Sequence, residues 1–329
     1  MVVVNNPGTW DAIYWPLDHA EWHGWTPTDL IFPFFLFIVG VSIAVSRHTL
    51  SAPWWRPARR AAVIVGLGLF MAGFPFFNAD HWRIPGVLQR IGVCYLAAAW
   101  LYRWTPKRHR PIALTAIAAA ILVASWWLLT RFGDLSAEGN VGARLDRALF
   151  GTHLYRTTWD PEGLLTTLPA VATTISGVLA GIWLRASGST QTKASALAGV
   201  GAAALAAGQV WHAALPINKQ LWTSSYVLLT AGAAAMTLAT CIYAIDVRGL
   251  RGWTRPFVVL GTNAISLFVV SGLVGKLLIV LDLQWTVYER GFAWIGSPKN
   301  ASLAYALMFL ALMYAMCDVM YRRGILLKA

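Results

Sequence analysis

The segment His19–Gly40, HAEWHGWTPTDLIFPFFLFIVG, decides how this chain is built. Thr26 is a potential N-cap, Pro27 suits the first helical turn, and Asp29 completes a capping-box pattern. No charged residue follows between Leu30 and Val45. The pattern predicts a membrane helix over 27–47 that holds a histidine-bearing segment at its mouth. Ionisable groups are costly at that depth, so they are candidates for function.

The composition indicates an all-α, polytopic transmembrane helix bundle. Of the 329 residues, 57% are hydrophobic and only 12% are charged, which argues against a soluble protein. Uninterrupted apolar runs of about 20 residues are long enough to cross a bilayer as helices. We interpret residues 1–329 as a single domain. Nine full helices are predicted, at 27–47, 58–77, 84–103, 110–131, 161–185, 194–213, 219–245, 256–281 and 300–321.

The first residues predict only the end of a further helix. Met1–Asn6 provides about 9 Å of helix, whereas a membrane helix needs about 20 residues. We therefore expect a truncated first helix, with the true start of the protein upstream of Met1.

The basic residues indicate the topology. The formal net charge of +12 could suggest nucleic acid, but Lys and Arg cluster in short loops. Examples are Arg56, Arg59 and Arg60, and the loop 103–110. By the positive-inside rule these loops are cytoplasmic, as is the C-terminus. His19 and the loops 132–160, 214–219 and 282–299 then face outward. We expect an integral protein of a bacterial inner membrane that contacts lipid and binds no nucleic acid.

Three further features bear on the architecture. Val141–Phe150 predicts a short amphipathic helix that lies on the membrane surface or covers a site. Ala194–Gly208 is almost all small residues, which favours close helix packing within the chain or between the subunits of a homodimer. Cys94, Cys241 and Cys317 lie in apolar runs without disulfide or metal-ligand spacing, so no metal is expected.

Several polar residues are predicted to lie in the outer third of the membrane. Arg90 is too deep to reach the interface easily and needs a carboxylate or an anionic ligand. Asp29 could act in the site or only cap its helix. Lys276 could bind a ligand or extend its ammonium to the interface.

Five ordered motifs then match a known family. They are Asn5–Gly8 (NNPG) with His19–Pro33 (HAEWHGWTPTDLIFP), Arg83–Gly92 (RIPGVLQRIG), Asp160–Leu164 (DPEGL), Pro216–Tyr226 (PINKQLWTSSY) and Gly261–Ala264 (GTNA). Together they resemble the heparan-α-glucosaminide N-acetyltransferase family, including bacterial relatives, over nearly the whole chain. The resemblance departs at the N-terminus, where most of the family's first core helix and the large luminal region of the animal enzyme are absent.

The resemblance implies a transmembrane acyltransferase that moves the acetyl group of cytosolic acetyl-CoA to an amino sugar or glycan across the membrane. His19 matches the family's active-site histidine, and Asn5 an asparagine near it. A histidine can act as a base or carry the acetyl group itself. We expect His19, Asn5 and Asp29 to be catalytic. The residues expected to bind acetyl-CoA are Gln89, Arg90, Asn218, Lys219, Trp222, Ser225, Tyr226, Asn263 and Lys276.

Other classes of function remain open on the sequence. A related enzyme would acetylate hydroxyl groups of a cell-envelope polysaccharide. A transporter or lipid flippase would use the same polar residues to bind cargo, although the chain has no evident internal repeat. A structural membrane subunit fits worst, because Arg90 and Lys276 would then cost free energy without a use.

Overall fold

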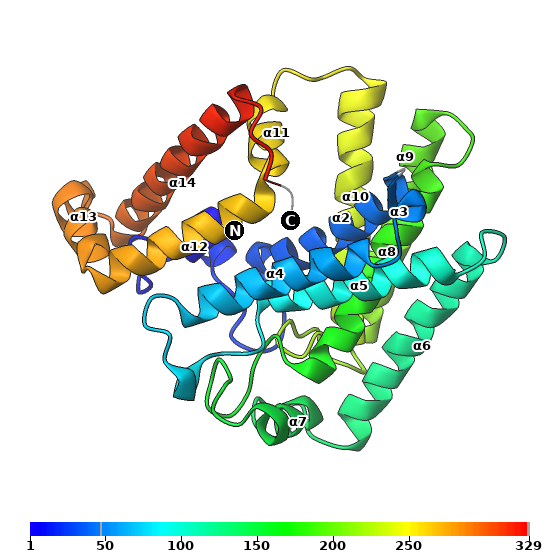
Figure 1. Cartoon of the computed structure of the whole chain (residues 1–329), viewed down its shortest axis with the longest axis horizontal. Helices are drawn as coiled ribbons and strands as arrows, with labels where there is room; N and C mark the ends of the chain where they lie inside the picture. Colours follow the sequence, from blue (N-terminus) through cyan, green and yellow to red (C-terminus); the bar gives the residue numbers. More distant parts are fainter. Residues whose placement is uncertain (47, 328–329) are drawn as a thin grey trace.

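The computed structural model describes residues 1–46 and 48–327, and this part of the chain is helical without strands. The α-helices are α1 (Val2–Asn5), α2 (Ile31–Val45), α3 (His48–Ser51), α4 (Arg56–Gly73), α5 (Val87–Trp104), α6 (Arg110–Arg131), α7 (Val141–Phe150), α8 (Leu164–Leu184), α9 (Thr190–Trp211), α10 (Ser224–Ile242), α11 (Arg255–Thr262), α12 (Ala264–Val280), α13 (Leu283–Gly291) and α14 (Pro298–Arg322). Short 3-10 turns are η1 (Trp15–Leu17), η2 (Pro27–Leu30), η3 (Ala79–His81) and η5 (Ala293–Ile295), and η4 (Tyr243–Val247) is a π-helical turn. Figure 1 shows their arrangement.

The helical membrane architecture is confirmed, but the count of nine spans is confirmed only in part. Among the described residues, six helices are long and apolar enough to cross a bilayer, or seven if the bent pair α11–α12 is one span. The expected spans at 58–77 and 84–103 correspond to α4 and α5, of 18 residues each, which are not among the six. α4 carries Arg56, Arg59 and Arg60 at its start, and α5 carries Arg90 and Arg103 near its two ends. Residue 47, the expected end of the first span, lies outside the described residues.

The predicted helix 256–281 is wrong as one continuous element. The chain breaks at Asn263, and α11 and α12 meet at an angle of 77°. Asn263 has φ −122° and ψ 38°, outside the helical region. Its buried amide donates to the carbonyl of Ile325 at 3.0 Å and accepts from the N–H of Leu327 at 2.9 Å. The helix therefore turns where a side chain binds the tail that follows α14, a contact that local sequence does not encode.

The loops separate onto two sides of the bundle. In Figure 1 the segments 74–86, 132–163 and 281–297 lie along the left and lower edges, and 104–110, 185–189 and 247–254 along the right and upper edges. These are the two groups into which the basic residues divided the loops. The short helix expected at Val141–Phe150 is present as α7, within the first group of loops.

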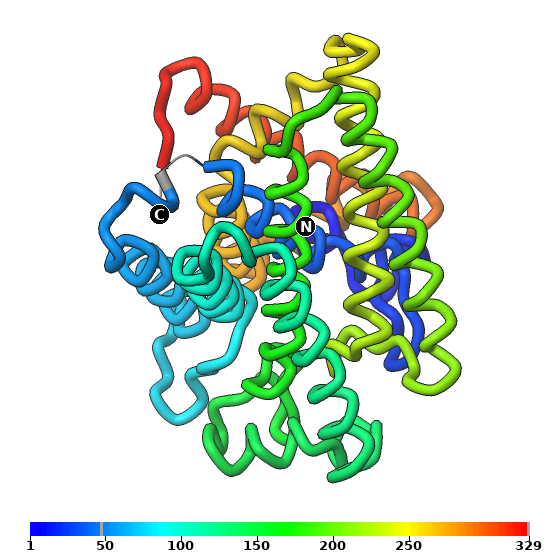
Figure 2. Tube along the Cα trace, turned by 90° about the vertical axis from the view of Figure 1, so that its right-hand side faces the viewer, coloured from blue at the N-terminus to red at the C-terminus, as the bar shows by residue number. Residues whose placement is uncertain are grey.

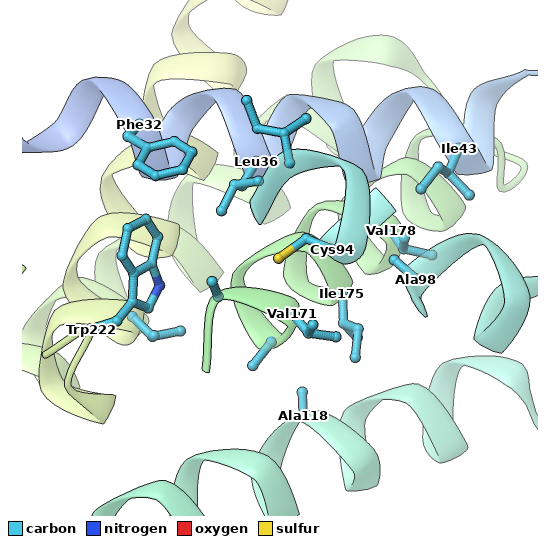
Figure 3. Close-up of a cluster of buried hydrophobic side chains, with 14 of the residues drawn as sticks. Phe32, Leu36, Ile43, Cys94, Ala98, Ala118, Val171, Ile175, Val178 and Trp222 are labelled. Atoms are coloured by element: carbon cyan, nitrogen blue, oxygen red, sulfur yellow. The ribbon is translucent and has the colours of Figure 1, made fainter. Parts of the chain in front are cut away.

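The bundle core gathers around α2 and α8. Phe32 and Leu36 of α2 meet Cys94 of α5 and Val171 and Ile175 of α8 in one buried cluster (Figure 3). Trp222, before α10, joins this cluster with its ring centroid 5.1 Å from that of Phe32. Because α2 starts directly after His19–Thr26, this packing fixes the histidine-bearing segment at one end of the bundle.

The small-residue helix packs within the chain, as expected for one of its two alternatives. α9 and α10 run side by side, most plainly in Figure 2. The backbones approach so closely that a Cβ atom on Gly232 would lie 2.5 Å from both the carbonyl oxygen of Gly201 and the N atom of Leu205. Gly199, on the same helix α9, has no atom within 4 Å of its own Cβ position. The two glycines therefore provide a test and its control.

Substitution Gly232→Ala should destabilise the protein by about 1–3 kcal/mol, because a methyl group overpacks the α9–α10 contact. Gly199→Ala should be neutral or slightly stabilising, since alanine favours helix and has room. Thermal unfolding of both variants in detergent measures the difference. Equal melting temperatures for the two variants would contradict the observed helix contact.

Candidate active site

His19 and Asp29 meet at the start of α2. Asp29 is 1% exposed, and its Oδ1 lies 2.7 Å from Nδ1 of His19. The His19 side chain is 42% exposed, so one face of the imidazole is open. The main-chain N–H of His19 donates to Oδ1 of Asp18 at 2.8 Å, which fixes the loop just before the site. The structure thus brings together two of the three residues expected to be catalytic.

Asp29 also caps its helix. Its Oδ2 accepts the N–H of Thr26 at 3.0 Å and that of Ala20 at 3.1 Å, and the predicted capping box with Thr26 is present. The two interpretations of Asp29 are therefore geometrically compatible. One carboxylate oxygen completes the cap, and the other faces the imidazole.

Lys219 reaches the same carboxylate from a distant part of the chain. Its Nζ lies 3.2 Å from Oδ1 of Asp29, 2.9 Å from Nδ1 and 3.3 Å from Nε2 of His19. Burial lowers the pKa of Lys219, and the Asp29 charge opposes this effect. Asn218, fully buried, accepts the N–H of Leu221 at 2.8 Å and lies 3.4 Å from Nδ1 of His23. The loop before α10 is therefore folded so that Lys219 points at His19.

Next to this cluster, the turn before α10 and the first residues of α10 supply three buried side chains. The Tyr226 hydroxyl donates to the Asp29 carbonyl at 2.6 Å. The Trp222 indole donates to Thr173 Oγ1 at 3.1 Å, and its residue has φ +49°, an uncommon backbone conformation for a bulky residue. The Ser225 hydroxyl lies 3.1 Å from that of Thr223. None of these three side chains forms a hydrogen bond with the imidazole among the described residues.

Arg90 is buried, as expected, but its partners are neutral oxygens. It donates to Thr167 Oγ1 at 3.2 Å, the Pro161 carbonyl at 2.9 Å and the Gly163 carbonyl at 3.3 Å, and also to the Thr166 hydroxyl. Its guanidinium lies 4.9 Å from the ring centroid of Trp222. No carboxylate forms an ion pair with it among the described residues. Arg90 therefore ties the segment before α8 to Trp222.

Arg83 forms an ion-pair cluster that the sequence reasoning did not single out. Its guanidinium donates to both oxygens of Asp160, at 2.8 and 2.6 Å, and also contacts Glu162. Burial alone would lower the pKa of Arg83, but the two carboxylates outweigh it and raise the pKa. The segments of Arg83 and of Asp160 both belong to the five ordered motifs, but nothing in either motif indicated that Arg83 pairs with Asp160.

Four expected site residues form no hydrogen bond with His19 among the described residues. Asn5 is exposed at the end of α1, and its side chain makes no hydrogen bond among the described residues. Gln89 donates to the Ile84 carbonyl at 3.0 Å. The Lys276 ammonium donates to carbonyls at the end of α4, including that of Phe74 at 3.1 Å. Asn263, as described above, holds the C-terminal tail.

A cavity of about 900 Å³ opens on the opposite side of the bundle, between α2, α4, α5 and the α11–α12 break. Arg56, Arg59 and Arg60 contribute to its wall, as does Asn263. The cavity follows α2 from Ser46 to Phe35, which corresponds to about 16 Å of helix. Its walls become apolar along this path, with Val39, Ile64 and Ile91 among them. The sequence had marked these arginines only as topology signals.

The fold and the site define a helical membrane protein with a histidine–carboxylate centre at one face and a basic cavity at the other. Residues 10–212 match the family described as heparan-alpha-glucosaminide N-acetyltransferase, catalytic. Because this match covers more than half of the chain, the chain belongs to that family. His19, Asp29 and Arg90 lie within the matched segment, and Lys219 lies just beyond it.

The chain is also similar to two animal proteins named heparan-alpha-glucosaminide N-acetyltransferase. It is 29% identical to the human protein over 336 residues and 28% identical to the mouse protein over 340 residues. In both cases the alignment covers 82% of this chain and 50% of the relative. The chain thus spans about half the length of the curated relatives it matches.

A second acidic group, Asp146 of α7, links the surface helix to the site. It is 1% exposed, and its Oδ1 accepts the N–H of Leu164 at 2.9 Å, at the start of α8. The pKa of Asp146 is raised to about 6, chiefly by burial and also by the nearby charge of Asp160. The N–H of Leu164 and the charge of Arg90 lower the pKa and offset part of this rise. The folded protein therefore keeps the Asp146 side chain protonated to a higher pH than the unfolded chain does.

This raised pKa predicts a pH-dependent stability. Protonated Asp146 makes its full contribution to the free energy of unfolding below the ordinary Asp pKa of about 3.9. That contribution is lost as the pH rises through about 6. Wild-type protein should therefore lose roughly 2–3 kcal/mol between pH 4 and pH 8 relative to Asp146→Asn, which cannot ionise. Melting temperatures of both proteins across that range measure this. Parallel curves would show that Asp146 titrates normally.

Proposed function

We propose that this protein is a membrane acetyltransferase that moves the acetyl group of cytosolic acetyl-CoA to the amino group of an amino sugar or glycan on the other side of the membrane. The observation that carries the proposal is the contact between Nδ1 of His19 and the buried Asp29 carboxylate. The family to which the chain belongs, and the names of the human and mouse relatives, support the same reaction.

The chemistry follows from the two ring nitrogens of His19. When Nδ1–H donates to Asp29, Nε2 carries the lone pair and can accept a proton. The amine of the acceptor attacks the thioester carbonyl of acetyl-CoA and forms an amide bond. His19 takes the proton that the amine loses, the carbon–sulfur bond breaks, and CoA leaves as a thiolate that is then protonated. Asp29 orients the imidazole and stabilises the charge it gains.

The basic cavity supports the binding of acetyl-CoA. CoA carries several phosphates at one end and a long, narrow thioester arm at the other. Arg56, Arg59 and Arg60 would bind the phosphates. The arm would follow the apolar wall past Val39 and Phe35 toward the start of α2. Because α2 runs from the cavity to Asp29, the same helix would guide the donor to His19.

The two-sided distribution of basic residues supports the direction of transfer. The cavity arginines lie on the side that the positive-inside rule makes cytoplasmic, and His19 on the other. Asn5, exposed at the end of α1, would then face the outer side, where it could contact the acceptor or the developing oxyanion. In a bacterium this places the acceptor outside the inner membrane. A homodimer would keep this arrangement in each subunit.

A vesicle assay tests the proposal and the role of His19 together. Sealed vesicles with labelled acetyl-CoA on the cytoplasmic face and glucosamine on the outer face should form N-acetylglucosamine. His19→Ala should reduce turnover by about 10²-fold or more, since general-base catalysis contributes on that order. His23→Ala, a neighbouring histidine without a carboxylate partner among the described residues, is the matched control. Transfer at wild-type rate by His19→Ala would exclude His19 as the base.

The donor site has its own test. Arg59→Gln should raise KM for acetyl-CoA about tenfold, because one charge-assisted phosphate contact is lost. It should leave KM unchanged for S-acetylpantetheine, a donor without the nucleotide phosphates. Arg248→Gln, an exposed arginine of the same side that does not line the cavity, is the control. A rise in KM for both donors would place the effect elsewhere than at the phosphates.

A further inference from the structure

One carboxylate oxygen at the site serves two cationic partners. Oδ2 of Asp29 is occupied by the N–H groups of Thr26 and Ala20. Oδ1 alone faces Nδ1 of His19 at 2.7 Å and Nζ of Lys219 at 3.2 Å. The imidazole and the ammonium therefore compete for the same negative charge.

The position of Lys219 is set by structure. Its main-chain carbonyl accepts the N–H of Trp222 at 3.1 Å, and its neighbour Asn218 is fully buried. The Lys219 side chain is 16% exposed, against 42% for His19. Its stem is therefore held inside the protein, and its ammonium ends between the carboxylate and the ring.

A carboxylate beside a histidine has an unwanted effect when it acts alone. It favours the imidazolium, which has no lone pair and cannot take a proton from an amine. A cation at a similar distance from the ring offsets this preference. Lys219 is the only Lys or Arg that forms an ion pair with Asp29 in the part of the chain that the structure describes.

We propose that Lys219 is a positioning residue of the acetyl-transfer centre: its ammonium balances the charge of Asp29, so that Asp29 orients His19 without protonating it. This inference rests on the proposed acetyltransferase function. It differs from the expectation that Lys219 binds acetyl-CoA, because it places the effect of Lys219 on the protonation of His19.

Other charged groups face the cluster from the surrounding elements. Glu162, in the loop just before α8, raises the pKa of Lys219, and Arg90, on α5, lowers it. Glu162 is itself paired with Arg83. On the loop of His19, Asp18 accepts its main-chain N–H. His23 contacts Asn218, and Tyr226 donates to the Asp29 carbonyl. None of these groups contacts Oδ1 of Asp29 in the described structure. Substitution of Lys219 by an uncharged residue therefore removes the one cation that shares Oδ1 with His19.

The test is the pH dependence of kcat/KM for acetyl transfer. In Lys219→Met the acid limb of this profile, where kcat/KM falls as the pH is lowered, should move up by at least about one pH unit. Two charges about 3 Å apart interact by about 1.4 kcal/mol even in bulk water, which corresponds to one unit. At high pH the rate should approach that of the wild type. Lys219→Arg, which keeps the charge, should leave the limb within a few tenths of a unit.

Gel filtration shows whether Lys219→Met folds. If it does not, the pH profile of Asp29→Asn tests the same charge balance. Its acid limb should move down by about one unit, since the ammonium then acts on His19 without opposition. The double variant, Asp29→Asn with Lys219→Met, should bring the limb back toward the wild-type position.

The outcomes separate this inference from the proposed function. If wild-type protein transfers no acetyl group, the proposed function fails. If wild type is active and His19→Ala is not, but the acid limb of Lys219→Met does not move, only the role of Lys219 is overturned. A rise in KM for acetyl-CoA with an unmoved limb would likewise overturn it and return Lys219 to donor binding.

Discussion

The site depends on one buried negative charge, the carboxylate of Asp29. A charge that is 1% exposed at the end of an apolar helix must be paired and hydrogen-bonded, because burial without partners is very unfavourable. Two main-chain N–H groups, His19 and Lys219 meet that requirement. The same partners bring the loop before α2 and the loop before α10 to one point. The carboxylate therefore fixes the local fold and assembles the site at once.

The start of α8 gathers buried polar groups in a similar way. Asp146 receives a main-chain N–H at the first residue of α8, and Arg90 donates to carbonyl and hydroxyl oxygens just around it. Arg83 holds Asp160 immediately before the helix. A helix start exposes unpaired N–H groups, so acidic side chains are stabilising there. The surface helix α7 and the α5 segment are thereby tied to the same helix that forms the core with α2.

The local features of the site followed from the sequence because they rest on short spacings. Thr26, Pro27 and Asp29 predicted the helix start that the structure shows, and Val141–Phe150 predicted α7. The close packing of the small-residue helix was also predicted, but its partner α10 was not. For Lys276 the sequence predicted a depth in the membrane but no direction, and the structure turns its ammonium toward main-chain carbonyls at the end of α4. Depth along a helix can be counted from residues, whereas the face it presents depends on what packs there.

By itself, the sequence determined the helical membrane architecture, the division of loops into two sides and the family, since these depend on hydrophobic length, charge distribution and ordered motifs. Only the tertiary structure decided which charges meet. Lys219 lies far along the chain from His19, and no periodicity relates them. The break at Asn263 likewise arises from its hydrogen bonds to the tail near Ile325. The physical reason is the same in both cases: buried polar groups take whichever partner the fold brings within reach, and that partner is set by packing between distant helices.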